Sequence, residues 1–193
     1  MKSLEINGNL REATGKKDSK KLRDQELIPC VLYGGEKNIH FYASVPEFRP
    51  LIYTPDVYVV NLNIDGKVYP SILQDAQWHP VEEQMLHADF LQIEENKPVK
   101  VELPVTIEGT AKGIKVGGKM KVNVRKLKVK GLVKNLPDTI VVNVTELDLG
   151  QSFKVGDLNL EGVQILAAKS NVIATINITR AAKAAQTGKE GKK

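Results

Sequence analysis

The sequence is poor in the residues that build disulfide or metal scaffolds. Cys30 is the only cysteine among 193 residues, so no intrachain disulfide can form, which fits a reducing compartment. The three histidines, His40, His79 and His87, form no paired-histidine helical motif, and there is no cysteine pair to complete a zinc site. We therefore expect neither a metal nor a cofactor.

Long apolar runs are also missing. No stretch approaches the roughly 18 consecutive apolar residues that span a membrane, and residues 1–9 lack the apolar core of a secretory signal. The sequence predicts a cytoplasmic protein without a membrane partner.

Catalytic motifs are absent as well. There is no G-x-S-x-G elbow and no P-loop, and Gly117-Gly118 lacks the strand-to-helix context of a nucleotide-binding loop. His79, His87 and Asp89 lie close in sequence, which allows acid–base chemistry, but no nucleophile stands beside them. We therefore predict no enzymatic activity and no small-molecule substrate.

The apolar residues that are present favour strands. Aromatic residues make up only 5% of the chain, and β-branched Val and Ile, which prefer pleated surfaces, dominate the rest. Asp65-Gly66 between two apolar runs is a strong hairpin signal. Residues 46–53 predict a short helical turn broken by Pro50. The strands expected in this first unit are residues 4–6, 28–33, 39–43, 57–64, 68–73 and 85–93.

A second unit follows the polar segment 94–98, where we place the domain boundary. Apolar and polar residues alternate from Val99 to Ile107, as in a half-buried strand, and Pro104 suggests an edge position. A second alternating run slips out of phase near Arg125-Lys126, which predicts a bulge. Further strands are expected at residues 139–144, 163–166 and 172–178.

The predicted fold class is therefore all-β, with short helices. It comprises a β-barrel domain at 1–94, a β-rich domain at 95–179 and a basic tail at 180–193. From residue 181 the tail has no apolar side chain larger than alanine, so it cannot bury enough surface to become ordered.

Charge is segregated along the chain. Residues 36–96 carry three basic and ten acidic groups, and residues 97–134 carry eleven basic and two acidic groups. Such segregation fits a polyanionic partner that touches part of the surface. The plainer alternative is solvated charge that keeps a β-rich protein soluble.

Two segments could contact RNA. In the first, Lys16, Ser19, Lys20 and Arg23 fall within about 100° on a helical wheel, and Leu22 points away and could anchor the helix to a core. In the second, residues 74–80 and 87–90 supply amides, imidazoles and a carboxylate, which can bond base edges or a 2′-hydroxyl. For His87 and Asp89 a purely structural hydrogen bond is an equal alternative.

The order of these motifs resembles a known family. Gly15-Lys16, Ser19 to Arg23, Ile28 to Gly34, Gln74-Asp75 and His87 to Phe90 occur as in the bacterial large-subunit ribosomal protein L-twenty-five. The pattern from Val105 to Leu158 resembles the second domain of its long form, the general stress protein CTC.

The resemblance implies a six-stranded N-terminal barrel that binds the loop E region of 5S rRNA, in the company of other large-subunit proteins. It also implies that the rRNA contacts lie at Arg11, Lys16, Ser19, Lys20, Lys21, Arg23, Tyr33, Gln74, His87 and Asp89. Lys20 and Lys21 stand where the family usually has arginines, so the charge is kept but bidentate geometry is lost. Trp78 occupies a position that is usually polar or basic in the family.

Two other functions compete with this hypothesis. A β-sandwich module for protein or carbohydrate binding would show no RNA affinity. A remnant of a tRNA-synthetase anticodon-binding domain would share the barrel architecture but would need a catalytic domain that this sequence lacks.

Overall fold

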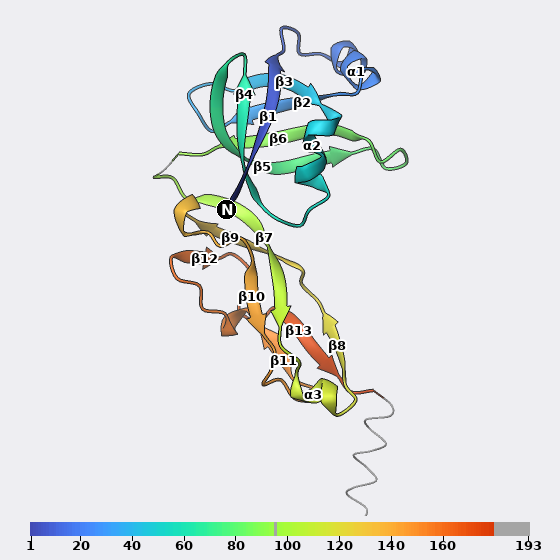
Figure 1. The fold of residues 1–193 in the computed structure, drawn as a ribbon, viewed down its shortest axis with the longest axis vertical. Helices are drawn as coiled ribbons and strands as arrows, with labels where there is room; N and C mark the ends of the chain where they lie inside the picture. Colours follow the sequence, from blue (N-terminus) through green and yellow to red (C-terminus); the bar gives the residue numbers. More distant parts are fainter. Residues whose placement is uncertain (95, 180–193) are drawn as a thin grey trace, which may run out of the picture. The chain divides into compact units, whose positions relative to one another are not determined.

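The computed structural model describes residues 1–94 and 96–179, which form two compact units built mainly of strands (Figure 1). The first unit comprises Met1–Val101 and Leu132–Asp138, and the second comprises Glu102–Gly131 and the described residues from Thr139. The predicted all-β fold class is confirmed. The predicted tail at 180–193 lies outside the described residues.

The first unit is a closed six-stranded barrel, as predicted, with strand order β1-β3-β2-β6-β5-β4. Two parallel pairings join segments far apart in the sequence: β1 pairs with β4, and β2 pairs with β6. Figure 1 shows helix α1 (Lys16–Asp24) outside the barrel wall. The strands are β1 (Lys2–Leu10), β2 (Leu27–Tyr33), β3 (Ile39–Ser44), β4 (Tyr58–Ile64), β5 (Lys67–Trp78) and β6 (Met85–Gln92).

The predicted hairpin forms between β4 and β5, with Asp65 and Gly66 both at positive φ. β5 is longer than expected, because it continues past Leu73 to Trp78 and pairs with β6 along the way. An irregularity between Leu73 and Asp75 marks a β-bulge at Gln74. This extension carries the polar Gln74–Trp78 segment onto the barrel wall, beyond the strand expected at residues 68–73.

Three aromatic rings fill the barrel core. Phe41, Phe48 and Phe90 are fully buried, and the Phe90 centroid lies 5.9 Å from that of Phe41 and 6.2 Å from that of Phe48. Gly8 on β1 allows this packing, since a Cβ there would come within 2.6 Å of the Phe41 ring. Phe48 comes from α2 (Val45–Ile52), which packs against β1 and β3.

Helix α2 continues through Pro50, so the prediction that Pro50 breaks it is wrong. A proline within so short a helix removes a single i→i−4 bond, and the Tyr53 amide still reaches the Arg49 carbonyl at 3.1 Å. The Pro50 carbonyl accepts a hydrogen bond from Thr54 Oγ1 at 2.8 Å.

Cys30 should be chemically silent in the native protein. Its side chain is fully buried, and burial raises the pKa of the thiol far above its usual range. Because only the thiolate attacks alkylating reagents, we expect iodoacetamide to label the native chain roughly a thousandfold more slowly than the denatured chain, since few molecules are unfolded at any time. Mass spectrometry of timed samples measures this rate. Comparable rates in the two states would mean that the barrel opens at Cys30.

The second unit has two sheets. One has the order β10-β7-β9-β12 and the other β11-β13-β8. Their buried cores include Leu103, Leu127, Ile140, Val142, Ile173 and Ile176. The elements from residue 99 onwards, of which η1 and the start of β7 belong to the first unit, are β7 (Val99–Glu108), α3 (Lys112–Lys115), β8 (Lys119–Val122), β9 (Lys126–Gly131), η1 (Val133–Asn135), β10 (Ile140–Asn143), β11 (Ser152–Lys154), η2 (Val155–Asp157), β12 (Val163–Ile165) and β13 (Val172–Asn177).

Two sequence expectations fail in this unit. β7 lies between β10 and β9 and is not an edge strand; Pro104 is tolerated because β10 pairs only with Val105–Glu108, beyond the proline. The phase slip near Arg125 is not a bulge, because β8 and β9 are separate strands that belong to different sheets.

The compact units divide differently from the domains predicted at 1–94 and 95–179. Strand β7 begins in the first unit and ends in the second, and residues 132–138 return to the first. Within the first unit, the amino group of Met1 forms an ion pair with Asp138 at 3.1 Å. The division at 1–94 and 95–179 therefore stays a proposal about which part of the chain carries which function.

Candidate nucleic-acid interface

Helix α1 presents a row of lysines to solvent. It starts after the extended residue Gly15 and buries none of its side chains. Lys16, Lys20 and Lys21 are exposed, and none of them has an ion-pair partner among the described residues. Unpaired ammonium groups on a helix outside the barrel are available to a polyanion.

Arg11 holds the start of α1. Its side chain is only 7% exposed and forms an ion pair with Asp18, with Nη2 donating to Oδ2 at 2.8 Å. The same Nη2 lies 3.2 Å from Ser19 Oγ and from the carbonyl of Ala13. Arg11 and Ser19, both predicted as RNA contacts, are thus joined to each other inside the protein. Sequence reasoning missed Asp18, the ion-pair partner of Arg11.

Arg23 fixes the other end of α1. Its Nε donates to the carbonyl of Leu86 at 3.0 Å, which attaches the last helical turn to the start of β6. Leu22 was expected to anchor the helix to the core, but it is only half-buried and lies outside the packed core cluster. Polar contacts from the two arginines replace that apolar anchor.

The outer face of β2, β6 and β5 forms a polar wall. In the strand register Val31 of β2 pairs with Asp89 of β6, and Asp89 pairs with Asp75 of β5. Two residues along, His87 pairs with Gln77. Since side chains alternate across a strand, these residues share the face opposite the buried Ala88 and Phe90. Asp75 and Gln77 are the wall residues that the predicted contacts omit, and the alternation with Asp89 and His87 is the signal that could have found them.

Asp89 carries an oxygen that lacks a well-directed hydrogen bond. Its Oδ1 lies 2.7 Å from His87 Nδ1, yet the atom is buried and no donor is correctly oriented towards it. The two side chains remain 26% (His87) and 32% (Asp89) exposed. The exposed part of the Asp89 carboxylate can accept a hydrogen bond from a ligand hydroxyl or amine.

Tyr33 adds a hydrogen-bond donor near Asp89. Burial raises the pKa of its hydroxyl, and the negative charges of Asp89 and Asp75 raise it further. The hydroxyl therefore keeps its proton at neutral pH and can donate to an acceptor on a ligand.

Gln74 is used partly by the protein itself. The bulge places it on the exposed side of β5, where its Nε2 donates to the carbonyl of Lys100 at 3.0 Å. The structure thus brings Tyr33, His87 and Asp89 together on the wall, attaches Arg23 next to it, and leaves the three lysines free on α1.

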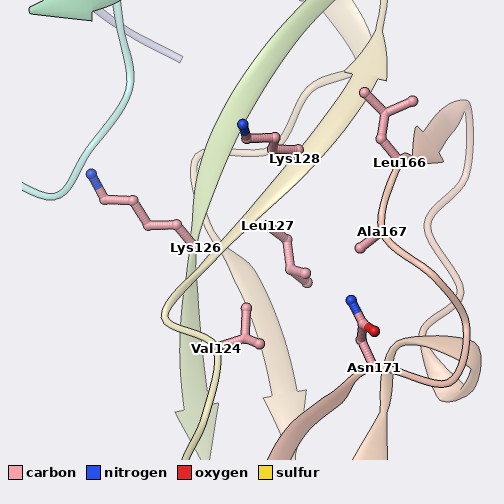
Figure 2. A pocket seen from close by; sticks show the side chains of 7 residues that line it. All are labelled: Val124, Lys126, Leu127, Lys128, Leu166, Ala167 and Asn171. Carbon is pink, nitrogen blue, oxygen red and sulfur yellow. The ribbon is translucent and has the colours of Figure 1, made fainter.

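The second unit contains a shallow hollow of about 220 Å³. Figure 2 shows Leu127 and Asn171 directed towards each other, while the amines of Lys126 and Lys128 point away. The remaining lining residues are Val124, Leu166 and Ala167, so the walls hold no carboxylate, histidine or cysteine for acid–base chemistry.

Two kinds of feature are absent from the described ranges 1–94 and 96–179. No group of three or more His, Cys, Asp or Glu side chains in these ranges could hold a metal ion. Within the same residues no helix has the length and apolarity to cross a bilayer.

Comparisons with known proteins match both parts of the chain. Residues 6–90 match the model of the Ribosomal L25p family, and residues 98–180 match that of the C-terminal domain of ribosomal protein TL5. A protein of Azobacteroides pseudotrichonymphae called large ribosomal subunit protein bL25 is 50% identical over 184 residues, which is 95% of this chain and 97% of the relative.

Other relatives carry the same name. The protein of Phocaeicola vulgatus is 47% identical over 96% of this chain and 97% of its own length. The protein of Porphyromonas gingivalis is 40% identical over 98% of this chain and all of its own length. The similarity therefore runs through both units.

Proposed function

The chain belongs to the bL25 family of large ribosomal subunit proteins, and from this premise we propose that it binds the loop E region of 5S rRNA. Its role in the ribosome is structural, so the prediction that it is no enzyme is confirmed, as is its ribosomal, cytoplasmic location. Neither a free-standing interaction module nor a synthetase remnant accounts for ribosomal relatives along the whole chain.

The lysines of α1 supply the general affinity. Lys16, Lys20 and Lys21 are exposed, and contacts between such ammonium groups and phosphates release counterions condensed on the RNA. These contacts hold the protein on any RNA helix but read no sequence. Arg11 and Arg23 act by holding the helix in place, because their guanidinium groups already bond Asp18 and Leu86.

The partly exposed carboxylate of Asp89, on the polar wall beside His87, carries the proposal. A carboxylate is repelled by phosphates, so on an RNA surface it is useful only where it accepts a specific hydrogen bond. An irregular helix such as loop E exposes 2′-hydroxyls and base edges in its wide, shallow minor groove. Tyr33 and His87 lie on the same wall and supply further polar groups, with Gln74 at its margin.

Recognition is assigned to the barrel domain, residues 1–94, because both RNA-contacting segments lie within it. Residues 95–179 are left for other neighbours in the large subunit, including other ribosomal proteins.

Asp89→Asn tests the wall directly. The substitution keeps the size of the side chain but replaces an acceptor with a donor, so binding to 5S rRNA should weaken by about 1–3 kcal/mol. On an unrelated RNA duplex the same change should be neutral or slightly favourable, because it removes a charge that phosphates repel. Titration of wild type and variant against both RNAs measures the difference.

Glu36→Gln is the matched control, since it removes one exposed carboxylate from the turn between β2 and β3. It should leave affinity for both RNAs unchanged. If Asp89→Asn weakened both RNAs equally and lowered the melting temperature, Asp89 would be a structural residue and the proposed contact would be wrong.

A further inference from the structure

The basic segment 97–134 contributes no charged side chain to the proposed 5S rRNA site. It carries eleven basic and two acidic residues. Ion pairs among the described residues occupy three of its lysines: Lys97 with Glu94, Lys112 with Glu146 and Lys128 with Glu102. Most of the positive charge in this segment therefore has no carboxylate beside it in the described part of the chain.

Strand β9 places three of these lysines on one face of its sheet. Leu127 and Val129 are buried, so the alternation of side chains along the strand turns Lys126, Lys128 and Lys130 to the opposite face. Figure 2 shows the amines of Lys126 and Lys128 directed away from the hollow that Leu127 lines. We call Lys126, Lys128 and Lys130 the lysine row.

Little negative charge compensates the lysine row. Lys126 and Lys130 form no ion pair with any residue in the described ranges. Lys128 Nζ lies 3.3 Å from Glu102 Oε1, but the two side chains are 71% and 52% exposed, so this ion pair contributes little and can be exchanged for another anion. Gln164 of β12 pairs with Lys130 and adds a neutral amide to the same face.

We propose that the lysine row binds backbone phosphates of ribosomal RNA outside the loop E region. Residues two apart on a strand are separated by about 6.5 Å, which is comparable to the separation of successive phosphates along an RNA strand. Adjacent lysines of the row can therefore contact adjacent phosphates.

The composition of this face favours RNA over an acidic protein. Lysine is depleted at protein–protein interfaces, whose centres are apolar, whereas interfaces with nucleic acid are strongly positive and polar. The lysine row and its neighbours Glu102 and Gln164 include no apolar side chain. Ammonium groups that contact phosphates hold the protein in place without reading sequence.

The inference rests on membership of the ribosomal family, which places both units among rRNA. It does not depend on contact between the barrel and 5S rRNA, because the lysine row belongs to the second compact unit. The two proposals can therefore fail separately.

Removing the lysine row should weaken assembly. In the full chain, Lys126→Ala/Lys128→Ala/Lys130→Ala should lower affinity for large ribosomal subunits depleted of this protein by about tenfold or more, because fewer condensed counterions are released. At fixed Mg²⁺, the plot of log affinity against log KCl should become shallower by roughly two units, since Glu102 already compensates part of the row. Binding to an RNA hairpin that holds only the loop E helix should not change.

The control variant Lys115→Ala/Lys119→Ala/Lys121→Ala removes the same charge from exposed positions of the second unit. It should leave subunit binding unchanged. Equal losses in the two triple variants, or no loss in either, would overturn the proposal. An equal loss on the loop E hairpin and on subunits would also overturn it, because the row would then belong to the loop E site.

Glu102→Gln tests the proposal with the opposite sign. It releases Lys128 from its exposed ion pair, so subunit binding should tighten by about twofold or more. The matched control Glu146→Gln releases Lys112 from a similarly exposed pair away from the row and should have no effect. Unchanged or weaker binding of the Glu102→Gln variant would contradict the proposal.

Photo-crosslinking identifies the class of partner. Azidophenylalanine in place of Gln164, beside Lys130 on β9, should cross-link to rRNA in purified, reassembled large subunits. Products with ribosomal proteins alone, or none, would overturn the proposal. A chain that joins subunits and cross-links to rRNA from position 164, yet fails to bind the loop E hairpin, would remove only the proposed function.

Discussion

Replacing Lys16, Lys20 and Lys21 together by alanine should weaken binding to 5S rRNA roughly a hundredfold at near-physiological salt, if each lysine neutralises one phosphate. On a plot of log affinity against log salt, each such contact contributes a slope of about −0.9, so the triple variant should be shallower by about 2.7. The helix itself should persist, because Arg11 and Arg23 fix its two ends and neither is changed.

The matched control is the triple alanine variant at Lys115, Lys119 and Lys121. These lysines are exposed in the second unit, and their removal changes net charge by the same amount. Titrations of wild type and both variants at several salt concentrations separate a local contact from a net-charge effect. Equal losses of slope in both variants would show that α1 is not the phosphate-binding element.

Replacing Phe90 by alanine should lower the free energy of unfolding by about 3–5 kcal/mol, the range for a fully buried ring that leaves a cavity. Phe90 is the ring that contacts both other core phenylalanines. It lies on β6, the strand that pairs with β2 on one side and with β5 on the other. Asp89, the residue before Phe90 on β6, faces the polar wall. If loss of the ring partly unfolds the barrel, RNA binding should therefore weaken as well. Denaturant unfolding followed by circular dichroism gives the free-energy difference.

Tyr53→Ala is the control for this substitution. Tyr53 is also a large aromatic residue of the barrel unit but is 81% exposed, so its removal should change stability by less than about 0.5 kcal/mol. A cost for Phe90→Ala no larger than that of Tyr53→Ala would mean that the aromatic cluster does not hold the barrel together.

Local chemistry determined much of this protein. Alternating apolar residues predicted β7, Asp65-Gly66 predicted the hairpin turn, and the lysines between Gly15 and Asp24 predicted an exposed basic helix, all of which the structure contains. These signals are local, because a strand, a two-residue turn and a helix face each depend on residues a few positions apart. The order of motifs along the chain also indicated the ribosomal family that the comparisons show.

Tertiary structure alone decided which residues meet. The parallel pairings of β1 with β4 and of β2 with β6 close the barrel and set Asp89 opposite Val31. No local pattern encodes such pairings, because register depends on the whole buried face of each strand. For the same reason the sequence could not reveal that Arg11 is turned inward onto Asp18 while the lysines stay free. The sequence of a basic residue is the same whether its side chain contacts solvent or a carboxylate. Only the folded structure distinguishes the basic residues that hold α1 in place from those that are free to bind a partner.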